Sequence, residues 1–402
     1  MAYVRGSRHD YDQWATEGCD GWSYKDVLPY FIKSEDNRVP WLQDSIYHGK
    51  EGPLTVSPGH VTGLDTYNSQ AMQELGYPTV DCNGENQIGY EPMTLTTRDG
   101  VRCSTSLAYL RPASNRENLH VSPNSLGYKS KKVNIVNKVA TGVQFIREGR
   151  KHFVHARREV ILSAGAINSP QILLLSGIGP KKHLQSLNIP VEEDLPVGQN
   201  LQDHLLVPLM FFPNESMSIV PEKAMSIWNI LLYKTMGKGK RIPLFYISKP
   251  TLTQIYQNMT MKYYIMEKLF LKTYRKNTNV FTVGPTLLQP ASTGTITLKS
   301  RDPFDPPIIE PNYLSNKDDI HTLRKGIRKS LELGSTQTFK RLGIKLEDTY
   351  LALPDCKEYR VPSDEYLDCY IQHLAFTIGH PCCTCKMGGS NDVSAVVDSK
   401  LR

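Results

Sequence analysis

The chain has 402 residues, with 47 Lys and Arg against 40 Asp and Glu, which gives a formal net charge of +7 at pH 7. The basic residues are scattered, so the charge does not favour a nucleic-acid-binding protein, and no apolar run approaches the roughly 20 residues of a membrane-spanning helix. Eight cysteines in so long a chain do not indicate a disulfide scaffold. We expect a globular protein whose large core is shared by two interlocked domains.

The first 125 residues are predicted to form short elements around an aromatic cluster. Aromatic side chains recur between residues 14 and 31, a pattern that indicates short packed helices. Beyond them, the pattern predicts an edge strand at residues 52–56, a helix at 65–76 and a strand at 118–121. Three further strands are predicted at 133–136, 141–146 and 152–156.

Residues 158–180 contain one of the clearest local patterns of the chain. Val160 to Leu162 form an apolar run that predicts a strand buried on both faces of a parallel sheet. The small residues Ser163, Ala164, Gly165 and Ala166 follow, and small side chains let a backbone turn closely against a neighbour or a flat ligand. Alone, this pattern is also typical of an ordinary β-α unit without a ligand.

A helix is predicted directly after this turn. Ser169 is a suitable N-cap and Pro170 suits the first helical position. Gly177 and Pro180 would end the helix.

The second half of the chain alternates between weak and clear patterns. Residues 205–279 are weakly patterned, with helical periodicity at 224–235 and 255–274. Clearer signals return afterwards: a regular segment at 281–288, an alternating strand at 293–298, a Pro-rich extended surface segment at 301–311, and a long helix at 317–334.

His380 lies in a short segment rich in reactive side chains, together with Cys382, Cys383 and Cys385. An imidazole is the side chain best suited to accept a proton near neutral pH. Three interpretations compete: a metal site built from the histidine and the cysteines, a cysteine nucleophile served by His380, and a structural histidine in a turn. Elsewhere, Asp203 and His204 are interpreted as part of a hydrogen-bonded loop.

Several segments together resemble the glucose-methanol-choline (GMC) family of FAD-dependent alcohol oxidoreductases, particularly its glucose dehydrogenase-like branch. The likeness extends over nearly the whole chain, although Gln289 stands where a histidine is usual in the family. The matching segments are 1–14, 165–179, 197–204, 287–290, 311–314 and 380–388.

The resemblance implies an enzyme that oxidises a CH–OH group of an alcohol or sugar. A hydride would pass to N5 of the flavin, while His380 takes the hydroxyl proton as general base. The electron acceptor would be oxygen or a quinone, no metal is expected, and the full-length form would be secreted. The positions implied to lie near FAD are Met1, Ala2, Tyr3, Gly127, Ala164, Gly165 and Ser169.

The implied fold is α/β plus α+β: an incomplete doubly wound FAD-binding domain interlocked with a substrate domain built on a mostly antiparallel sheet with helices. The expected divisions are residues 1–206 for the remainder of the FAD-binding region, 207–280 for a weakly patterned helical segment of the substrate region, and 281–402 for the catalytic region.

The G-x-G-x-x-G fingerprint of the family is not among these residues, and both ends break inside family motifs. We therefore expect a sequence truncated at both ends, with weak or no FAD binding. The alternative is a non-catalytic fragment or relative that acts by binding.

Overall fold

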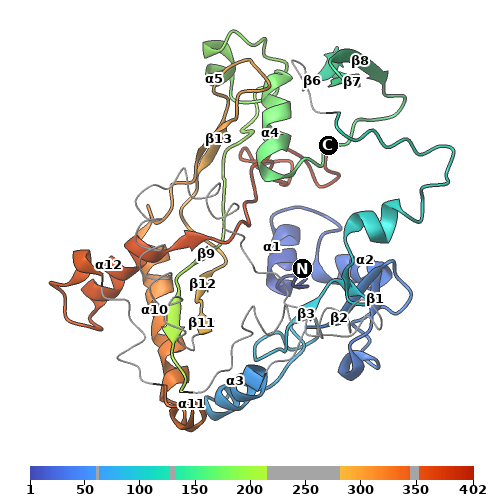
Figure 1. Cartoon of the computed structure of the whole chain (residues 1–402). Coiled ribbons are helices and arrows are strands. Elements are labelled where there is room, and N and C mark those ends of the chain that lie inside the picture. The colour runs from blue at the N-terminus through green and yellow to red at the C-terminus, as the bar shows by residue number, and fades with distance from the viewer. Residues whose placement is uncertain (60–62, 126–131, 215–280, 345–352) are drawn as a thin grey trace.

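The computed structural model describes residues 1–59, 63–125, 132–214, 281–344 and 353–402. Three groups of elements surround the middle of the molecule (Figure 1). One holds α1, α2 and the β1-β2-β3 sheet, a second holds α4, α5 and β6 to β8, and the third holds α10 to α12 with β9 to β12. The predicted helices at 224–235 and 255–274, and Gly127, lie outside the described residues.

The first group begins with two capped helices, α1 (Arg8–Thr16) and α2 (Tyr24–Ser34). The Ser7 side chain accepts the His9 amide at the start of α1, and Ser23 forms a capping box with Asp26 at the start of α2. The predicted aromatic cluster is confirmed: the Tyr11 ring lies edge-on to Trp14 and Phe31, with centroids 5.3 and 5.8 Å away. These rings hold the two helices together.

The predicted edge strand at 52–56 is in fact the centre of a small sheet. β2 (Leu54–Pro58) pairs in parallel with β1 (Glu35–Asn37) on one side and antiparallel with β3 (Thr94–Leu95) on the other. The strand is confirmed, but its predicted edge position was wrong, because β1 is a polar Glu-Asp-Asn segment directly after a helix, and such a sequence gives no strand signal.

The rest of this part contains one confirmed helix and one strand that does not form. α3 (Gly63–Glu74) confirms the helix predicted at 65–76. Residues 118–121 are not a strand, and Val121 is exposed, because Pro112 and Pro123 flank a segment of successive turns. The remaining short elements are η1 (Pro40–Leu42), β4 (Thr97–Arg98), β5 (Val101–Arg102) and the π-helical turn η2 (Ser106–Leu110).

The three strands predicted between 133 and 156 are confirmed as one antiparallel sheet. Its order is β6-β7-β8, with a register shift between Asn134 and Ile135. Short turns join the strands, and both residues of the first turn, Asn137 and Lys138, have positive φ. The strand bounds are β6 (Lys132–Val136), β7 (Val139–Arg147) and β8 (Arg150–His155).

The apolar run after this sheet does not form the predicted strand. Residues 160–162 have no strand pairing with the described part of the chain, and the Ile161 side chain is 77% exposed. A strand needs a neighbour to pair its backbone groups, and none lies beside this segment among the described residues. The prediction of a strand at 160–162 was therefore wrong.

The helix that follows begins earlier than predicted. α4 spans Gly165–Leu175 with Ala164 at its N-cap, so Ser169 and Pro170 lie inside the helix. Ser169 still stabilises the start of the helix, because its Oγ accepts the backbone N–H of Ala164 at 3.0 Å. Gly165 has a φ of +82°, a conformation that glycine adopts readily, and this lets the chain turn into the helix at that point. Ser176 follows as the C-cap, and Gly177, with a positive φ, ends the helix as predicted.

The third group contains the largest apolar core. Leu323 and Ile327 of α10 (Lys317–Ser335) pack with Leu367 and Ile371 of α12 (Asp364–Leu374), all almost fully buried. The helix predicted at 317–334 is thus confirmed. Its neighbours are β9 (Leu205–Leu206), β10 (Leu209–Phe211), β11 (Phe281–Val283), β12 (Thr286–Leu287), α11 (Gln337–Arg341), η4 (Pro354–Cys356) and β15 (Phe376–Thr377).

A hairpin connects this group to α4. β13 (Thr295–Thr297) pairs antiparallel with β14 (Ile308–Glu310). All three residues of β14 are exposed, and they lie within the stretch 301–311 that was predicted to be an extended surface segment. A second, smaller core joins α4 and α5 (Lys181–Ser186) through Leu174 and Leu184, which are fully buried. No helix of the described segments is long and apolar enough to cross a bilayer.

Candidate active site

The His380 loop leaves the third group directly after β15. Phe376 and Thr377 pair with Leu206 and Leu205 of β9, and beyond the loop's turn the backbones of Cys382 and Gln202 exchange two hydrogen bonds. The loop is therefore held against residues 202–206 on both sides of His380. The imidazole itself is exposed to solvent.

A buried carboxylate fixes the backbone at His380. Asp203, only 5% exposed, accepts the His380 N–H on Oδ1 at 3.0 Å. Its Oδ2 accepts the Tyr313 hydroxyl at 2.6 Å and the Thr377 hydroxyl. Burial and the Asp203 carboxylate both raise the pKa of Tyr313. Its phenol therefore stays protonated as a donor, which secures Asp203 in place.

His204 meets His380 across the same loop. The two Nδ1 atoms lie 3.1 Å apart and the rings are nearly perpendicular. Burial, followed by the charge of His380, lowers the pKa of His204, although Asp203 and a hydrogen bond to the backbone of Leu288 act in the opposite direction. His204 is thus kept neutral beside His380. The sequence-based interpretation of His204 as an ordinary loop residue missed this pairing.

The N-terminus of α4 is tied to the His380 loop. The Thr384 hydroxyl donates to the backbone carbonyl of Ala166 at 2.6 Å. Nothing lies within 4 Å of where a Cβ on Gly165 would sit. The structure therefore brings Ala164, Gly165 and Ser169 to the same part of the molecule as the loop, with open space at the helix start.

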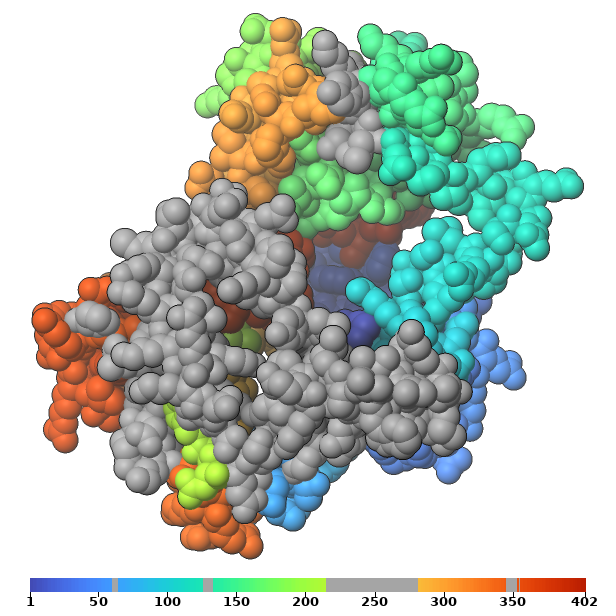
Figure 2. Space-filling view, viewed as in Figure 1, coloured from blue at the N-terminus to red at the C-terminus, as the bar shows by residue number. Residues whose placement is uncertain are grey.

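The apolar run before α4 lines a hollow of about 790 Å³. Val160, Ile161 and Leu162 form part of its wall with Ser163 and Ser169. Figure 2 shows that the molecule is hollowed in the middle of this face, where blue N-terminal and dark red C-terminal residues lie between the groups. The segments far apart in the sequence thus converge on a central space.

The N-terminal residues lie along β3. Ala2 forms an antiparallel bridge with Leu95, and the Tyr3 N–H donates to the Thr94 carbonyl at 3.0 Å. Further along the N-terminal segment, Asp10 of α1 accepts the side-chain amide of Gln289, which lies shortly after β12. The described contacts do not join Met1, Ala2 or Tyr3 directly to His380.

An interior charge network supports this N-terminal segment. Arg5 donates to Glu35 at 2.7 Å and to the Tyr3 hydroxyl at 3.2 Å. His48 bonds to Glu35 through Nδ1 at 2.9 Å and to Asp81 through Nε2 at 2.8 Å. These residues lie up to 78 positions apart in the sequence, from Tyr3 to Asp81, so no local motif could have indicated them.

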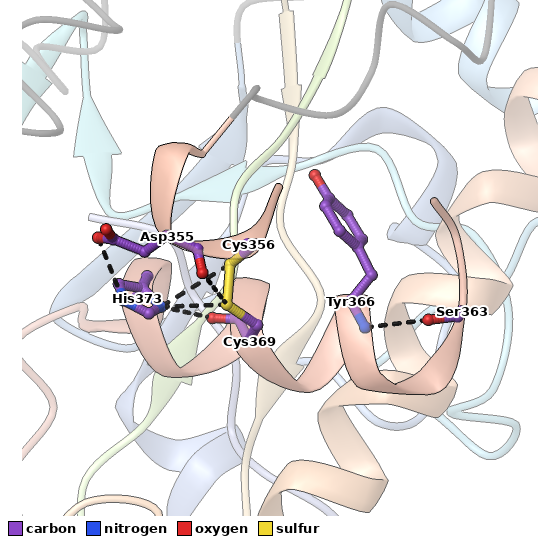
Figure 3. Close-up of a disulfide and its surroundings, with 6 residues drawn as sticks. All are labelled: Asp355, Cys356, Ser363, Tyr366, Cys369 and His373. Atoms are coloured by element: carbon purple, nitrogen blue, oxygen red, sulfur yellow. Dashed lines mark hydrogen bonds and ion pairs between the residues drawn. A yellow bond between two sulfur atoms is a disulfide. The ribbon is translucent and has the colours of Figure 1, made fainter. Parts of the chain in front are cut away.

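The metal interpretation of the cysteine segment receives no geometric support. Among the described residues, the one cluster with metal-ligand geometry is Cys356, Cys369 and His373, which does not include His380. Figure 3 shows that the two sulfur atoms of this cluster form a disulfide, with His373 and Asp355 beside it. Sulfur atoms bonded to each other are not thiolate ligands.

Comparisons with known proteins agree with this arrangement. The N-terminal model of the GMC oxidoreductase family matches residues 1–206, and the C-terminal model matches residues 290–402. Glucose dehydrogenase [FAD, quinone] of Drosophila melanogaster is 35% identical over 421 residues, covering 100% of this chain and 66% of that protein. Mitochondrial choline dehydrogenase of Homo sapiens is 35% identical over 415 residues, covering 100% of this chain and 67% of that protein.

A solved structure is also similar. An FAD-dependent oxidoreductase from Chaetomium thermophilum matches with a TM-score of 0.80 and 26% identity, over 100% of this chain and 77% of that one. The chain belongs to the GMC oxidoreductase family. The predicted fold class is confirmed by this match and by the mixture of helices with parallel and antiparallel strand pairs. The chain spans about two thirds of the length of the fly and human relatives.

Proposed function

We propose that this protein is an FAD-dependent oxidoreductase that oxidises a CH–OH group of an alcohol or sugar, with His380 as the general base. The observation that carries the proposal is the exposed His380 imidazole, whose backbone is anchored to buried Asp203 and whose Nδ1 faces His204. An anchored imidazole beside open space is what proton abstraction from a bound hydroxyl requires.

The contacts of His204 and His380 indicate which ring nitrogen of each histidine carries a proton. The His204 ring donates to the backbone of Leu288, and because its Nδ1 faces His380, we assign this donation to Nε2. Neutral His204 then has an unprotonated Nδ1, which accepts the Nδ1–H of His380. This leaves Nε2 of His380 with a free lone pair, which is the atom that would take the substrate proton.

His204 also supports His380 after proton transfer. A protonated His380 would still donate through Nδ1 to the neutral His204 ring. The carboxylate of Asp203 accepts the backbone N–H of His380 and would keep the loop in the same position in both states. The pair can therefore hold the proton without rearranging the loop.

The residues at the start of α4 fit a flat cofactor. Gly165 has no side chain and open space beyond it, Ala164 precedes it, and the apolar run Val160 to Leu162 lines the hollow. Ala164, Gly165 and Ser169 would hold FAD there, together with Met1, Ala2 and Tyr3 of the N-terminal segment. When bound, FAD would supply the hydride-accepting centre at its N5 atom.

The substrate and acceptor classes follow the family relatives. Glucose and choline dehydrogenases are among the similar proteins, and one of them is described as using a quinone. We infer a small alcohol or sugar as substrate and oxygen or a quinone as electron acceptor. The Cys356–Cys369 disulfide favours an oxidising compartment, so we also infer secretion of the full-length form.

Flavin uptake and turnover test this proposal together. The chain, whose FAD binding we expect to be weak, is purified and titrated with FAD to saturation, and it should then reduce an artificial dye with members of a panel of alcohols and sugars. Flavin binding without turnover of any member would favour the alternative, a relative that acts by binding. No flavin binding at any FAD concentration would rule out the proposed activity for this chain.

A further inference from the structure

Two adjacent cysteines beside His380 are placed for reaction with each other. The Sγ atoms of Cys382 and Cys383 lie 2.7 Å apart. This separation is larger than the roughly 2.05 Å of a disulfide bond but is a close contact for two sulfur atoms. Cys383 has a φ of +73°, a left-handed conformation that is uncommon outside glycine. The backbone is therefore held in an unusual turn at the point where the two sulfur atoms meet.

The two thiols differ in their readiness to ionise. A hydrogen bond from Cys382, together with the charge of Lys386, lowers the pKa of Cys383 despite its burial. The same hydrogen bond, together with burial, raises the pKa of Cys382. One sulfur atom is thus favoured as the thiolate nucleophile while its neighbour keeps its proton. Cys382 is exposed to solvent and Cys383 is half-buried, so small reagents can reach the pair.

We propose that Cys382 and Cys383 form a redox-active pair that hydrogen peroxide converts reversibly to a vicinal disulfide. The Cys383 thiolate attacks one peroxide oxygen and the O–O bond breaks, giving a sulfenic acid and a hydroxide that takes the Cys382 proton as water. The Cys382 thiolate then attacks Sγ of Cys383, the S–S bond forms, and the S–O bond breaks to release hydroxide. Counting the proton that Cys383 first lost to solvent, two thiols and one peroxide give one disulfide and two waters.

The chain contains a second cysteine pair that serves as a contrast. Cys356 and Cys369 are 13 positions apart with Cα atoms separated by 5.9 Å, within the usual range for a structural disulfide. Adjacent Cα atoms are only about 3.8 Å apart, below the usual range of about 4.4 to 6.8 Å. A disulfide between neighbours is therefore strained and easily reduced, which makes it reversible.

The pair acts on the loop that carries His380. The backbone of Cys382 exchanges two hydrogen bonds with Gln202, the residue before Asp203. His380 lies two positions earlier and is anchored to that same Asp203. Formation of the disulfide would thus constrain the backbone immediately beside the His380 anchor. This inference concerns the thiols alone and does not depend on bound flavin.

Peptide mapping of the 402-residue chain tests the proposal. The protein is treated with a small excess of hydrogen peroxide, and its remaining thiols are alkylated without reduction. The mass of the peptide containing residues 382 and 383 is then measured by mass spectrometry. We expect this peptide to be unalkylated at both cysteines and about 2 Da lighter than the dithiol, with both thiols restored by dithiothreitol. Full alkylation of both cysteines after peroxide would overturn the proposal, as would a disulfide that joins either of them to Cys385.

Single variants separate the two steps. Cys382→Ser should stop the reaction at the sulfenic acid of Cys383, which dimedone traps, whereas Cys385→Ser is the matched control and should still form the disulfide. Circular dichroism confirms that each variant is folded. If Cys382→Ser is folded but carries no dimedone adduct after peroxide, Cys383 is not the attacking thiol and the proposed sequence is wrong.

Discussion

The Oδ1 atom of Asp203 accepts the backbone N–H of His380 at 3.0 Å, and the carboxylate that makes this contact is almost completely buried. A buried carboxylate is stable only when its hydrogen bonds are complete. Asp203 achieves this with the His380 backbone, Tyr313 and Thr377, which bring separate segments of the chain together. The position of the candidate base therefore depends on a residue that does not itself face the central space.

Replacement of Asp203 by Asn should destabilise the protein by about 2 to 3 kcal/mol, because one end of the new amide would direct N–H groups at donors. Urea unfolding monitored by circular dichroism measures this loss. Tyr313→Phe is the control, since it removes one hydrogen bond to the same carboxylate and should cost about 1 kcal/mol. Equal stability of Asp203→Asn and the unmodified chain would show that the carboxylate is not the anchor.

The buried network around His48 should make stability fall at alkaline pH. Burial alone would lower the pKa of His48, but hydrogen bonds to Asp81 and Glu35 outweigh it and raise the pKa to about 9. A raised folded-state pKa gives stability that is fully present below the ordinary value of 6.5 and is lost as the pH rises through about 9. The free energy of unfolding should therefore decrease between these two pH values.

Urea unfolding at a series of pH values measures this slope. His48→Gln should flatten it, whereas His321→Gln, at an exposed position on α10, should leave it unchanged. A slope that persists in His48→Gln would assign the pH dependence to another group.

Gly165 and Gly149 provide a matched pair for the proposed FAD contact. Their φ angles are +82° and +75°, and at neither residue does any atom lie within 4 Å of the position that a Cβ would occupy. Alanine at either position should cost about 1 kcal/mol of stability, because a left-handed conformation is unfavourable for a residue with a Cβ. Only Gly165→Ala should also weaken FAD binding, since Gly149 lies in the turn between β7 and β8.

Fluorescence titration with FAD distinguishes the two variants. A loss of affinity in Gly149→Ala equal to that in Gly165→Ala would mean that the change acts through general destabilisation. Unchanged affinity in both would remove Gly165 from the proposed FAD contacts.

Local patterns predicted much of the fold. The long helix α10 was predictable because its apolar residues follow helical spacing, and the β6-β7-β8 sheet because its strands are joined by short turns. The strand at 160–162 was mispredicted, since an apolar run does not reveal whether a partner strand lies beside it. β1 was missed because its residues are polar and its pairing with β2 is a tertiary contact.

The candidate site was only partly predictable, because the contacts that form it are also tertiary. His380 could be selected by its residue type and by the resemblance of its segment to a family motif. Its partners Asp203 and His204, and Tyr313, which donates to Asp203, lie at least 67 positions away, and only folding brings them to the loop. The contact of Thr384 with Ala166, which joins the loop to α4, spans 218 positions and was equally hidden.

Turnover by His380→Gln at a fixed flavin content tests the central claim most directly. The variant keeps the backbone N–H that Asp203 accepts but lacks a group able to take a proton near neutral pH. With the same amount of FAD bound per chain, dye reduction by the best substrate of the panel should fall about 100- to 10,000-fold. Turnover equal to that of the unmodified chain would contradict the assignment of His380 as the base.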